Sequence, residues 1–407
     1  MGEWHAVSRR RFLVGIATAL GSASLIRSKP TGALPDVVAE DLVLEPRAYL
    51  PHVARRNTPN APPNPGKVVH IRTPAATTWS GETDYWNYVD QSTVDSMVEL
   101  GLKELTGEAT AVDAWKRLMP QYQPGQKIAI KVNFNNTRYC EGSVVVIDAI
   151  IEPVNAVAKG LVAMGVAPSD ICIYDAVRAI PDRFVSGADY DLMFHDGAWE
   201  AACQDSAGFT AVPENRVQFY PPVAISMPEE YVTNVLMDAS YLINMPIMKG
   251  AHPIAGVTLG FKNHFGTIDA CAGLHDYVNV VGVPPAYRTD YDPLVDLLGS
   301  PLIGGKTVLT VGDALFAARI FNQAPVPWTT FGEQLPNSLF FATDPVAVDC
   351  IMHDLIIAEP GTAVPEDANN YLRLAADTGL GVFEAGDPWQ EPFGNGYSSI
   401  DYTRIDM

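Results

Sequence analysis

KIAIKVN at residues 127–133, IIEPVNAVAKGLVAMG at 150–165 and ICIYD at 171–175 determine the architecture of this chain. In the first segment Ile or Val stands at every second position, which is typical of a strand, and the third segment is a short apolar run of strand length. In the second segment, apolar side chains recur at helical spacing up to a closing glycine. This order predicts a βαβ unit with parallel strands and a right-handed crossover.

The same alternation continues along the chain. Helical spacing between residues 94 and 105 predicts a helix that Ser92 or Thr93 caps, and Asp344 followed by Pro345 predicts the start of another. The remaining predictions are strands at 241–245, 307–311 and 338–342 and helices at 255–265 and 346–357. Strands alternating with helices predict an α/β fold with two lobes, each with a mainly parallel sheet flanked by helices.

Four parts are predicted along the chain: a targeting signal over 1–33, an extended proline-rich arm over 34–80, a first α/β lobe over 81–240 and a second over 241–407. Prolines crowd the arm, and such a stretch cannot sustain a helix or a central strand. They are Pro51, Pro59, Pro62, Pro63 and Pro65. We therefore expect the arm to be a linker or to lie along the surface.

The signal segment has the pattern of a twin-arginine export signal. SRRRFLV at 8–14 places paired arginines before Phe-Leu, and a modest apolar run over 13–26 follows. The alternative is an amphipathic start with chance arginines. The apolar run is too short for a comfortable transmembrane helix, so no stable membrane anchor is expected. The pattern predicts the twin-arginine translocase as a partner and a periplasmic or otherwise exported protein.

Composition narrows the classes of partner. The chain has 407 residues, with 27 Lys and Arg against 47 Asp and Glu, and a formal net charge of -20. Without the five basic residues and one acid of 1–33, 22 basic and 46 acidic residues remain. Nucleic acids and anionic membranes bind clustered positive charge, so neither is an expected partner. An anionic substrate would need a local basic site.

The cysteines predict little. Cys140, Cys172, Cys203, Cys271 and Cys350 include no C-x-x-C pair, so no iron–sulfur cluster is expected. Twin-arginine substrates fold in a reducing cytoplasm, and for that reason no disulfide framework is expected either.

Candidate site residues follow the strands, because ligands of open α/β sheets bind beyond the carboxyl ends of the strands. Cations and amides dominate these positions in a chain that is otherwise acidic. We expect His252, Lys262 and Lys249 to transfer protons, and we expect a small anion to be bound by Lys131, Asn133, Arg138, Asn263 and Asp175.

A metal site is also an open alternative, with His264, Asp313 and Asp349 as its ligands. Asp344 is more simply a helix cap. Asp349 lies in an apolar helix, where it is either on an exposed face or buried with a cation such as Lys262. The chain has no P-loop, no G-x-S-x-G elbow and no H-E-x-x-H motif.

Four motifs together resemble the bacterial and archaeal family called domain of unknown function 362, over about residues 125–355. They are Lys131-Val132-Asn133, the run from Asn244 to Gly266, Gly312-Asp313-Ala314 and the run from Thr343 to Asp349. Many relatives carry ferredoxin-type cysteine clusters, which this chain lacks. The family name assigns no chemistry.

A more distant resemblance is to the nickel-pincer lactate racemase family. The run from His252 to Lys262 matches its H-x-x-x-G-x-T-x-G-x-K pattern, and NNTR at 135–138 is similar to its D-x-T-R-P segment. The resemblance implies a lactate-racemase-like fold, proton transfer by His252, a cofactor held covalently by Lys262 and a substrate carboxylate held by Arg138. Asp175-Ala176-Val177-Arg178 replaces a histidine-containing segment of that family, and His275 is a candidate for its metal-ligating histidine.

Two functions are consistent with these patterns. The first is an exported enzyme with isomerase, racemase-like or redox-type chemistry on a small carboxylate in a cleft between the lobes, using Lys and His proton transfer with or without a metal ion or organometallic cofactor. The second is a non-catalytic periplasmic protein that binds a metal or a small molecule.

Overall fold

The computed structural model describes residues 65–407 except 138, 143–144, 198–201, 223–224, 253–255, 270, 281–285 and 288. The predicted export signal and most of the predicted arm lie outside the described residues, as does Arg138. No helix in the described part of the chain is long and apolar enough to cross a membrane.

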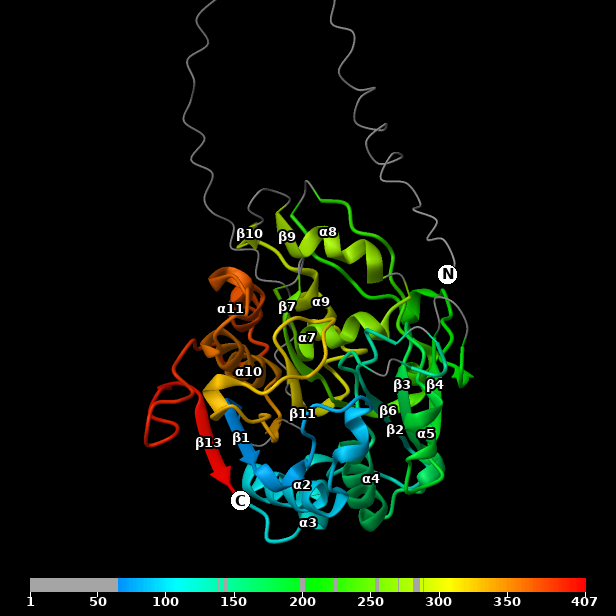
Figure 1. Ribbon diagram of the computed structural model, residues 1–407. Coiled ribbons are helices and arrows are strands. Elements are labelled where there is room, and N and C mark those ends of the chain that lie inside the picture. Colours follow the sequence, from blue (N-terminus) through cyan, green and yellow to red (C-terminus); the bar gives the residue numbers. More distant parts are fainter. Residues whose placement is uncertain are drawn as a thin grey trace, which may run out of the picture. The chain divides into compact units, whose positions relative to one another are not determined.

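A mixed sheet of eleven described strands organises the fold, in the order β13-β1-β12-β11-β6-β2-β3-β4-β5, with β7 paired to β11 and β8 (Figure 1). Neighbours from β11 through β6, β2, β3 and β4 to β5 are parallel, as are β1 with β13 and β11 with β7. The strands are β1 (Lys67–Arg72), β2 (Lys127–Lys131), β3 (Ile171–Asp175), β4 (Met193–Asp196), β5 (Asp205–Ser206), β6 (Ala239–Asn244), β7 (Ile247–His252), β8 (Gly256–Thr258), β11 (Thr307–Ala318), β12 (Ser338–Ala342) and β13 (Asp401–Asp406). The predicted α/β fold is confirmed.

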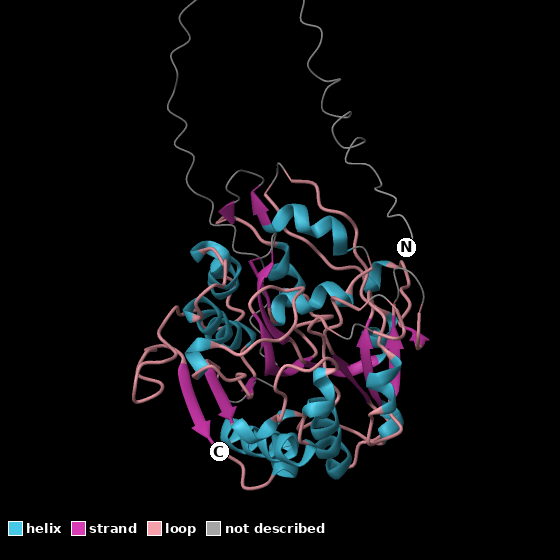
Figure 2. Ribbon diagram, viewed as in Figure 1, coloured by secondary structure: helices cyan, strands magenta, loops and turns pink. Residues whose placement is uncertain are grey.

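Helices cover both faces of this sheet (Figure 2). Ile128 and Ile130 of β2 pack with α2, α3 and α4 in one core, whereas Ala129 between them belongs to the core that contains α10 and α11. Successive side chains of a strand point to opposite faces of the sheet because the strand is pleated. The helices are α2 (Gln91–Thr106), α3 (Ala111–Leu118), α4 (Glu152–Met164), α5 (Asp182–Ser186), α6 (Asn234–Asp238), α7 (Gly260–Asn263), α8 (His275–Val278), α9 (Pro293–Gly299), α10 (Pro345–Ala358) and α11 (Asn370–Asp377). A separate hairpin joins β9 (Asn279–Val280) to β10 (Ala286–Tyr287).

The predicted βαβ unit is present as β2, α4 and β3, with β2 and β3 parallel. Gly165 ends α4 with a φ of 105°, a left-handed conformation that favours glycine. The predicted cap of α10 is also confirmed, since the Asp344 carboxylate accepts hydrogen bonds from Val346 N and Ala347 N at 2.9 Å. Both predicted lobe ranges, 81–240 and 241–407, contribute strands to the one sheet.

Four local predictions need correction. The cap of α2 is Asp90, whose carboxylate accepts a hydrogen bond from Thr93 N at 2.7 Å, and is neither Ser92 nor Thr93. The predicted arm over 34–80 contains β1, an interior strand, because the mainly apolar segment Val68-Val69-His70-Ile71 closely follows the proline cluster. The helix predicted over 255–265 is instead β8 followed by the short α7 and a 3₁₀ turn. The strand predicted over 307–311 continues to Ala318 as β11.

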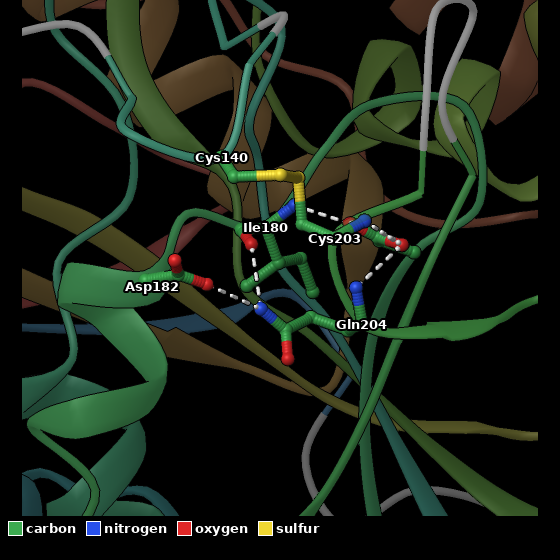
Figure 3. Close-up of a disulfide and its surroundings, with 6 residues drawn as sticks. Cys140, Ile180, Asp182, Cys203 and Gln204 are labelled. Atoms are coloured by element: carbon green, nitrogen blue, oxygen red, sulfur yellow. Dashed lines mark hydrogen bonds between the residues drawn. A yellow bond between two sulfur atoms is a disulfide. The ribbon is translucent and has the colours of Figure 1, made fainter.

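No disulfide framework was expected, but the structure contains a disulfide. Cys140 and Cys203 form one, with their Cα atoms 5.4 Å apart (Figure 3). Cys140 follows β2 and Cys203 follows β4, and adjacent parallel strands bring the loops after them to one edge of the sheet. The other cysteines, Cys172, Cys271 and Cys350, are unpaired and buried.

Candidate functional site

Three buried lysines come from elements at the carboxyl ends of the parallel strands. Lys131 ends β2, Lys249 lies on β7 and Lys262 lies on α7, with exposed fractions of 0%, 0% and 9%. A buried lysine is rare unless it is paired. The partners of the three amines differ, and so does the chemistry available to each.

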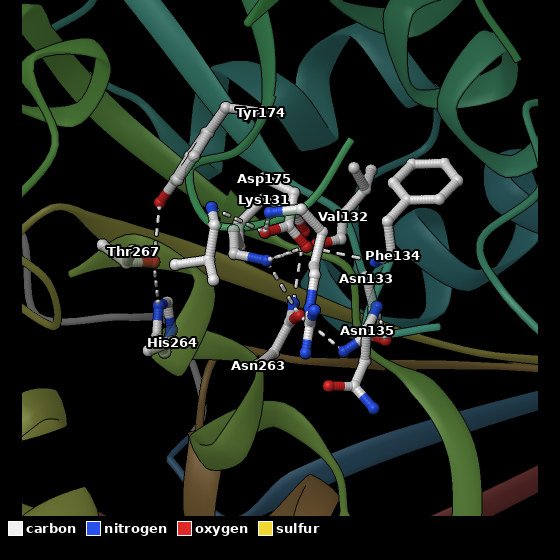
Figure 4. A network of polar contacts seen from close by, with 12 residues as sticks. Lys131, Val132, Asn133, Phe134, Asn135, Tyr174, Asp175, Asn263, His264 and Thr267 are labelled. Carbon is white, nitrogen blue, oxygen red and sulfur yellow. Dashed lines mark hydrogen bonds and ion pairs between the residues drawn. The ribbon is translucent and has the colours of Figure 1, made fainter. Parts of the chain in front are cut away.

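Lys131 uses all three of its hydrogens. Its Nζ donates to Asp175 Oδ2 at 3.2 Å, to Asn263 Oδ1 at 3.1 Å and to the carbonyl of Val132 (Figure 4). An ammonium group has three donors, so this one has none left for a ligand. Lys131 therefore positions its neighbours.

Asn263 joins α7 to two strands. Its Oδ1 also accepts from Asn133 Nδ2 at 3.0 Å, and its Nδ2 donates to Asn244 Oδ1 at 2.7 Å. Asn244 at the end of β6 donates in turn to the carbonyl of Gly260 at 3.0 Å. These buried bonds fix α7 against β2 and β6.

Asp175 completes the network around Lys131. It accepts backbone hydrogen bonds from Phe134, Val177 and Arg178, in addition to its 3.2 Å contact with Lys131. Gly266 covers this ion pair so closely that a Cβ there would lie 2.6 Å from Asp175 Oδ1 and 2.7 Å from Lys131 Nζ. A glycine is required at this position because of that contact.

Asp349 is fully buried, and its partners are backbone amides. Its two carboxylate oxygens accept from Gly260 N at 2.8 Å and Phe261 N at 3.0 Å, and Tyr371 OH lies 3.3 Å from it. Burial raises its pKa to about 7, against the opposing effect of these hydrogen bonds. Neither an exposed face nor an ion pair with Lys262 accounts for Asp349; it anchors the start of α7.

Lys249 Nζ has no hydrogen-bond partner among the described residues. Thr258 stands opposite Lys249 in the β7–β8 pairing. Thr258 Oγ1 also has no hydrogen-bond partner among the described residues. Burial lowers the pKa of Lys249 to about 8; the Lys131 and Arg178 cations lower it further, while Asp148 and Asp175 oppose the shift.

Lys262 Nζ lies 2.8 Å from His275 Nε2 and 3.7 Å from the centre of the Phe265 ring. Burial lowers the pKa of Lys262 to about 7, with Lys249 and Arg178 adding to the effect. Lys249 and Lys262 are thus two amines whose pKa values lie near neutrality, and such groups can give and take protons at physiological pH.

A second polar chain runs beside the Lys131 network (Figure 4). Tyr174 OH lies 3.1 Å from Thr267 Oγ1, which lies 3.2 Å from His264 Nδ1. His264 Nε2 has no partner within the described part of the chain. Burial lowers the pKa of His264 to about 3, so its ring is neutral.

The candidate metal ligands His264, Asp313 and Asp349 are not brought together. Asp313 accepts a hydrogen bond from Leu315 N at 3.0 Å, and burial raises its pKa to about 7. In the described part of the chain, no three His, Cys, Asp or Glu side chains form a group that could hold a metal. These residues therefore do not fit a resident metal centre, and we derive no step through one.

The structure brings together Lys131, Asn133, Asp175 and Asn263, and electrostatic coupling relates Lys131, Lys249 and Lys262. His252 is the last residue of β7, and its side chain lies outside the described part of the structure.

The sequence pointed to Arg178 only by its place after a strand and to His275 only as a candidate metal ligand, and it assigned no separate role to Thr258 or Gly266. Arg178 lies three residues after the end of β3. Its charge acts on both Lys249 and Lys262.

A family model described as Domain of unknown function (DUF362) matches residues 128–354. The matched range contains all three buried lysines, Asn263 and Asp349. No curated protein matches the chain.

Proposed function

The chain belongs to the DUF362 family, and on that premise we propose that it is an exported enzyme that moves a proton on a small carboxylate. The observation that carries the proposal is the convergence of buried amines at the strand ends. Lys249 and Lys262, with pKa values lowered to about 8 and about 7, lie within electrostatic range of each other and of Arg178. Such mutually repelling cations favour an anion between them.

In this mechanism the carboxylate of the substrate offsets the charge of Arg178 and of the lysines. Lys249 in its neutral form accepts a proton from the carbon next to the carboxylate of a 2-hydroxy acid, or next to the carbonyl of a 2-oxo acid, since its Nζ is unpartnered among the described residues. Lys262, coupled to His275 at 2.8 Å, supplies a proton to the substrate. Lys131 and Asn263 hold the site in shape.

His252 is proposed as a second proton carrier, on the strength of the distant similarity to the lactate racemase family. The run from His252 to Lys262 supports that relationship and an isomerase-type reaction. A cofactor of the nickel-pincer kind has no resident metal-ligand set in the described residues, so every step above uses side chains of this chain.

Export through the twin-arginine translocase is the second part of the proposal. Its supports are the SRRRFLV segment at 8–14 and the disulfide between Cys140 and Cys203. Disulfides persist in oxidising compartments, and the periplasm is one of them.

The proposal is tested by deuterium wash-in. The exported protein is incubated in D2O with 2-hydroxy and 2-oxo carboxylates, and loss of the C–H signals is followed by proton NMR. We expect exchange into one class of substrate, at least 100-fold slower in Lys249→Met and in Lys262→Met and unchanged in the surface control Lys116→Met. Carboxylate binding without exchange would favour the non-catalytic alternative.

A further inference from the structure

The three site lysines differ in how many of their hydrogens are used, and this difference separates their roles. Lys131 has three acceptors and Lys262 has His275. Lys249 has no acceptor in the described structure, although it is fully buried. A buried polar atom without a partner is uncommon and calls for an explanation.

A second unpartnered atom lies on the same side of the hairpin. Lys249 and Thr258 are paired residues of antiparallel β7 and β8, so their side chains project from the same face. Thr258 Oγ1 is buried and, within the described residues, also lacks a partner. An amine and a hydroxyl on paired residues are thus left without a partner within the described part of the chain.

We propose that Lys249 is a nucleophile that forms an imine with a 2-oxo carboxylate, an inference that rests on the proposed function and specifies its substrate class. In this refinement Lys249 attacks the carbonyl carbon in place of accepting the proton itself, and Lys262 accepts the proton from the carbon next to the imine. An amine that serves only as a cation would be held by acceptors, as Lys131 is. The neutral amine needed for attack is accessible because burial lowers the pKa of Lys249 to about 8.

The step is balanced without an added redox partner. The Nζ lone pair attacks the carbonyl carbon, and a C–N bond forms as the carbonyl π bond opens to a hydroxyl. The two protons of the neutral amine pass to this oxygen, the first to complete the hydroxyl and the second to release it as water, and the C=N bond replaces the C–O bond. Thr258, the partner residue of Lys249 in the β7–β8 pairing, is the group that we assign to hydrogen-bond the departing hydroxyl.

The class of carbonyl compound follows from the proposed function, in which the substrate carries a carboxylate. Asp148 and Asp175 act on Lys249 more strongly than the cations Lys131 and Arg178 do. Asp175 is already held by Lys131 at 3.2 Å and Asp148 by Thr137 at 2.6 Å, and neither accepts a hydrogen bond from Lys249. A carbonyl for the imine and a carboxylate for the proposed function together identify a 2-oxo carboxylate.

The experiment is reductive trapping on the full exported protein. The protein is incubated at pH 8 with pyruvate and sodium cyanoborohydride, and the product is analysed by intact mass and peptide mapping. We expect one reduced pyruvate adduct per chain, on Lys249, and at least tenfold less labelling with acetone, which lacks the carboxylate. Lys249→Arg keeps the positive charge but cannot form the imine, so it should remain unlabelled. The surface control Lys116→Arg should label as the wild type does.

Three outcomes overturn the inference: no adduct, an adduct on another lysine, or equal labelling by acetone. They are distinguishable from failure of the proposed function. If deuterium is washed in but no adduct is trapped, the proposed proton transfer stands and the imine is excluded. If an adduct forms on Lys249 but no deuterium is washed in, the imine stands and the proposed proton transfer is excluded. A melting curve for Lys249→Arg checks that its lack of labelling reflects chemistry, and Lys249→Met provides an independent unlabelled variant.

Discussion

Lys249 and Thr258 face each other across the β7–β8 pairing, and neither Lys249 Nζ nor Thr258 Oγ1 has a hydrogen-bond partner in the described part of the chain. Buried polar atoms in this condition destabilise a fold. Their presence in one hairpin is the reason why we propose that this hairpin binds the substrate at the expense of stability.

Lys249→Met should therefore stabilise the protein while it abolishes activity. Replacing an unpartnered buried amine by an apolar chain of similar length should raise the free energy of unfolding by about 1–3 kcal/mol. Urea unfolding at pH 7 measures this free energy. The exposed control Lys116→Met should have an unfolding free energy within about 0.5 kcal/mol of the wild type. A loss of stability in Lys249→Met would show that the amine is held by protein groups.

The gain from Lys249→Met should shrink as the pH rises. The folded-state pKa of Lys249 is about 8 against an ordinary 10.5, so between these values the unfolded chain binds more protons and the stability of the wild type rises with pH. Urea unfolding curves at pH 7 and at pH 10 give the difference in unfolding free energy between Lys249→Met and the wild type at each pH. An equal gain at both would contradict the lowered pKa.

Gly266→Ala should disturb the Lys131 network. The added Cβ would lie under 3 Å from Lys131 Nζ and Asp175 Oδ1, so the ion pair must move. We expect a loss of about 1–3 kcal/mol in unfolding free energy and weaker substrate binding. Gly299→Ala is the matched control, since its nearest side-chain atom is 4.0 Å away. Equal effects at the two glycines would argue against a specific role for Gly266.

Asp313→Asn should flatten the pH dependence of stability. Burial raises the folded-state pKa of Asp313 from 3.8 to about 7. Within that window the folded state keeps a proton that the unfolded chain releases, so the contribution of Asp313 to stability is lost as the pH rises towards 7. Melting temperatures at pH 4.5 and pH 7.5 should differ less in the variant than in the wild type. An unchanged difference would mean that Asp313 ionises freely in the fold.

Reduction should weaken the loops after β2 and β4. The Cys140–Cys203 bond closes a loop of sequence separation 63, and its removal by Cys203→Ser should cost about 2–4 kcal/mol. Thiol titration of the denatured, unreduced exported protein should find three thiols, those of Cys172, Cys271 and Cys350. Five thiols would show that the disulfide does not form.

Export is tested separately from catalysis. Changing Arg9 and Arg10 together to lysine keeps the charge of the signal but removes the paired arginines. Cell fractionation should then find the variant in the cytoplasm and the wild type in the periplasm. Equal periplasmic amounts would exclude a twin-arginine route.

Local patterns predicted much of the fold, and long-range contacts account for what they missed. The βαβ unit and the Asp344 cap depend on neighbours within a few residues, so periodicity and capping rules find them. The Asp349 bonds to Gly260 and Phe261 join residues 89 and 88 positions apart. No spacing rule indicates such a contact.

The candidate site shows the same division. Lys131, Asn133, Asp175 and Asn263 were predicted because each follows or ends a strand or lies in the glycine-rich run, and they do share one network. The partners of Lys262 could not be predicted, because His275 reaches it through a turn whose path the sequence does not specify. The Cys140–Cys203 pair likewise depends on which strands are neighbours.

The most direct test of the central claim, proton transfer by the buried amines, is the pH profile of deuterium wash-in for the exchanging carboxylate. Lys249 acts as its neutral amine, so wash-in by the wild type should rise with pH through about 8, the pKa of that group. Lys249→Met should lose this limb of the profile together with at least 99% of the rate, while remaining folded. A profile with the same rising limb in Lys249→Met would contradict the account.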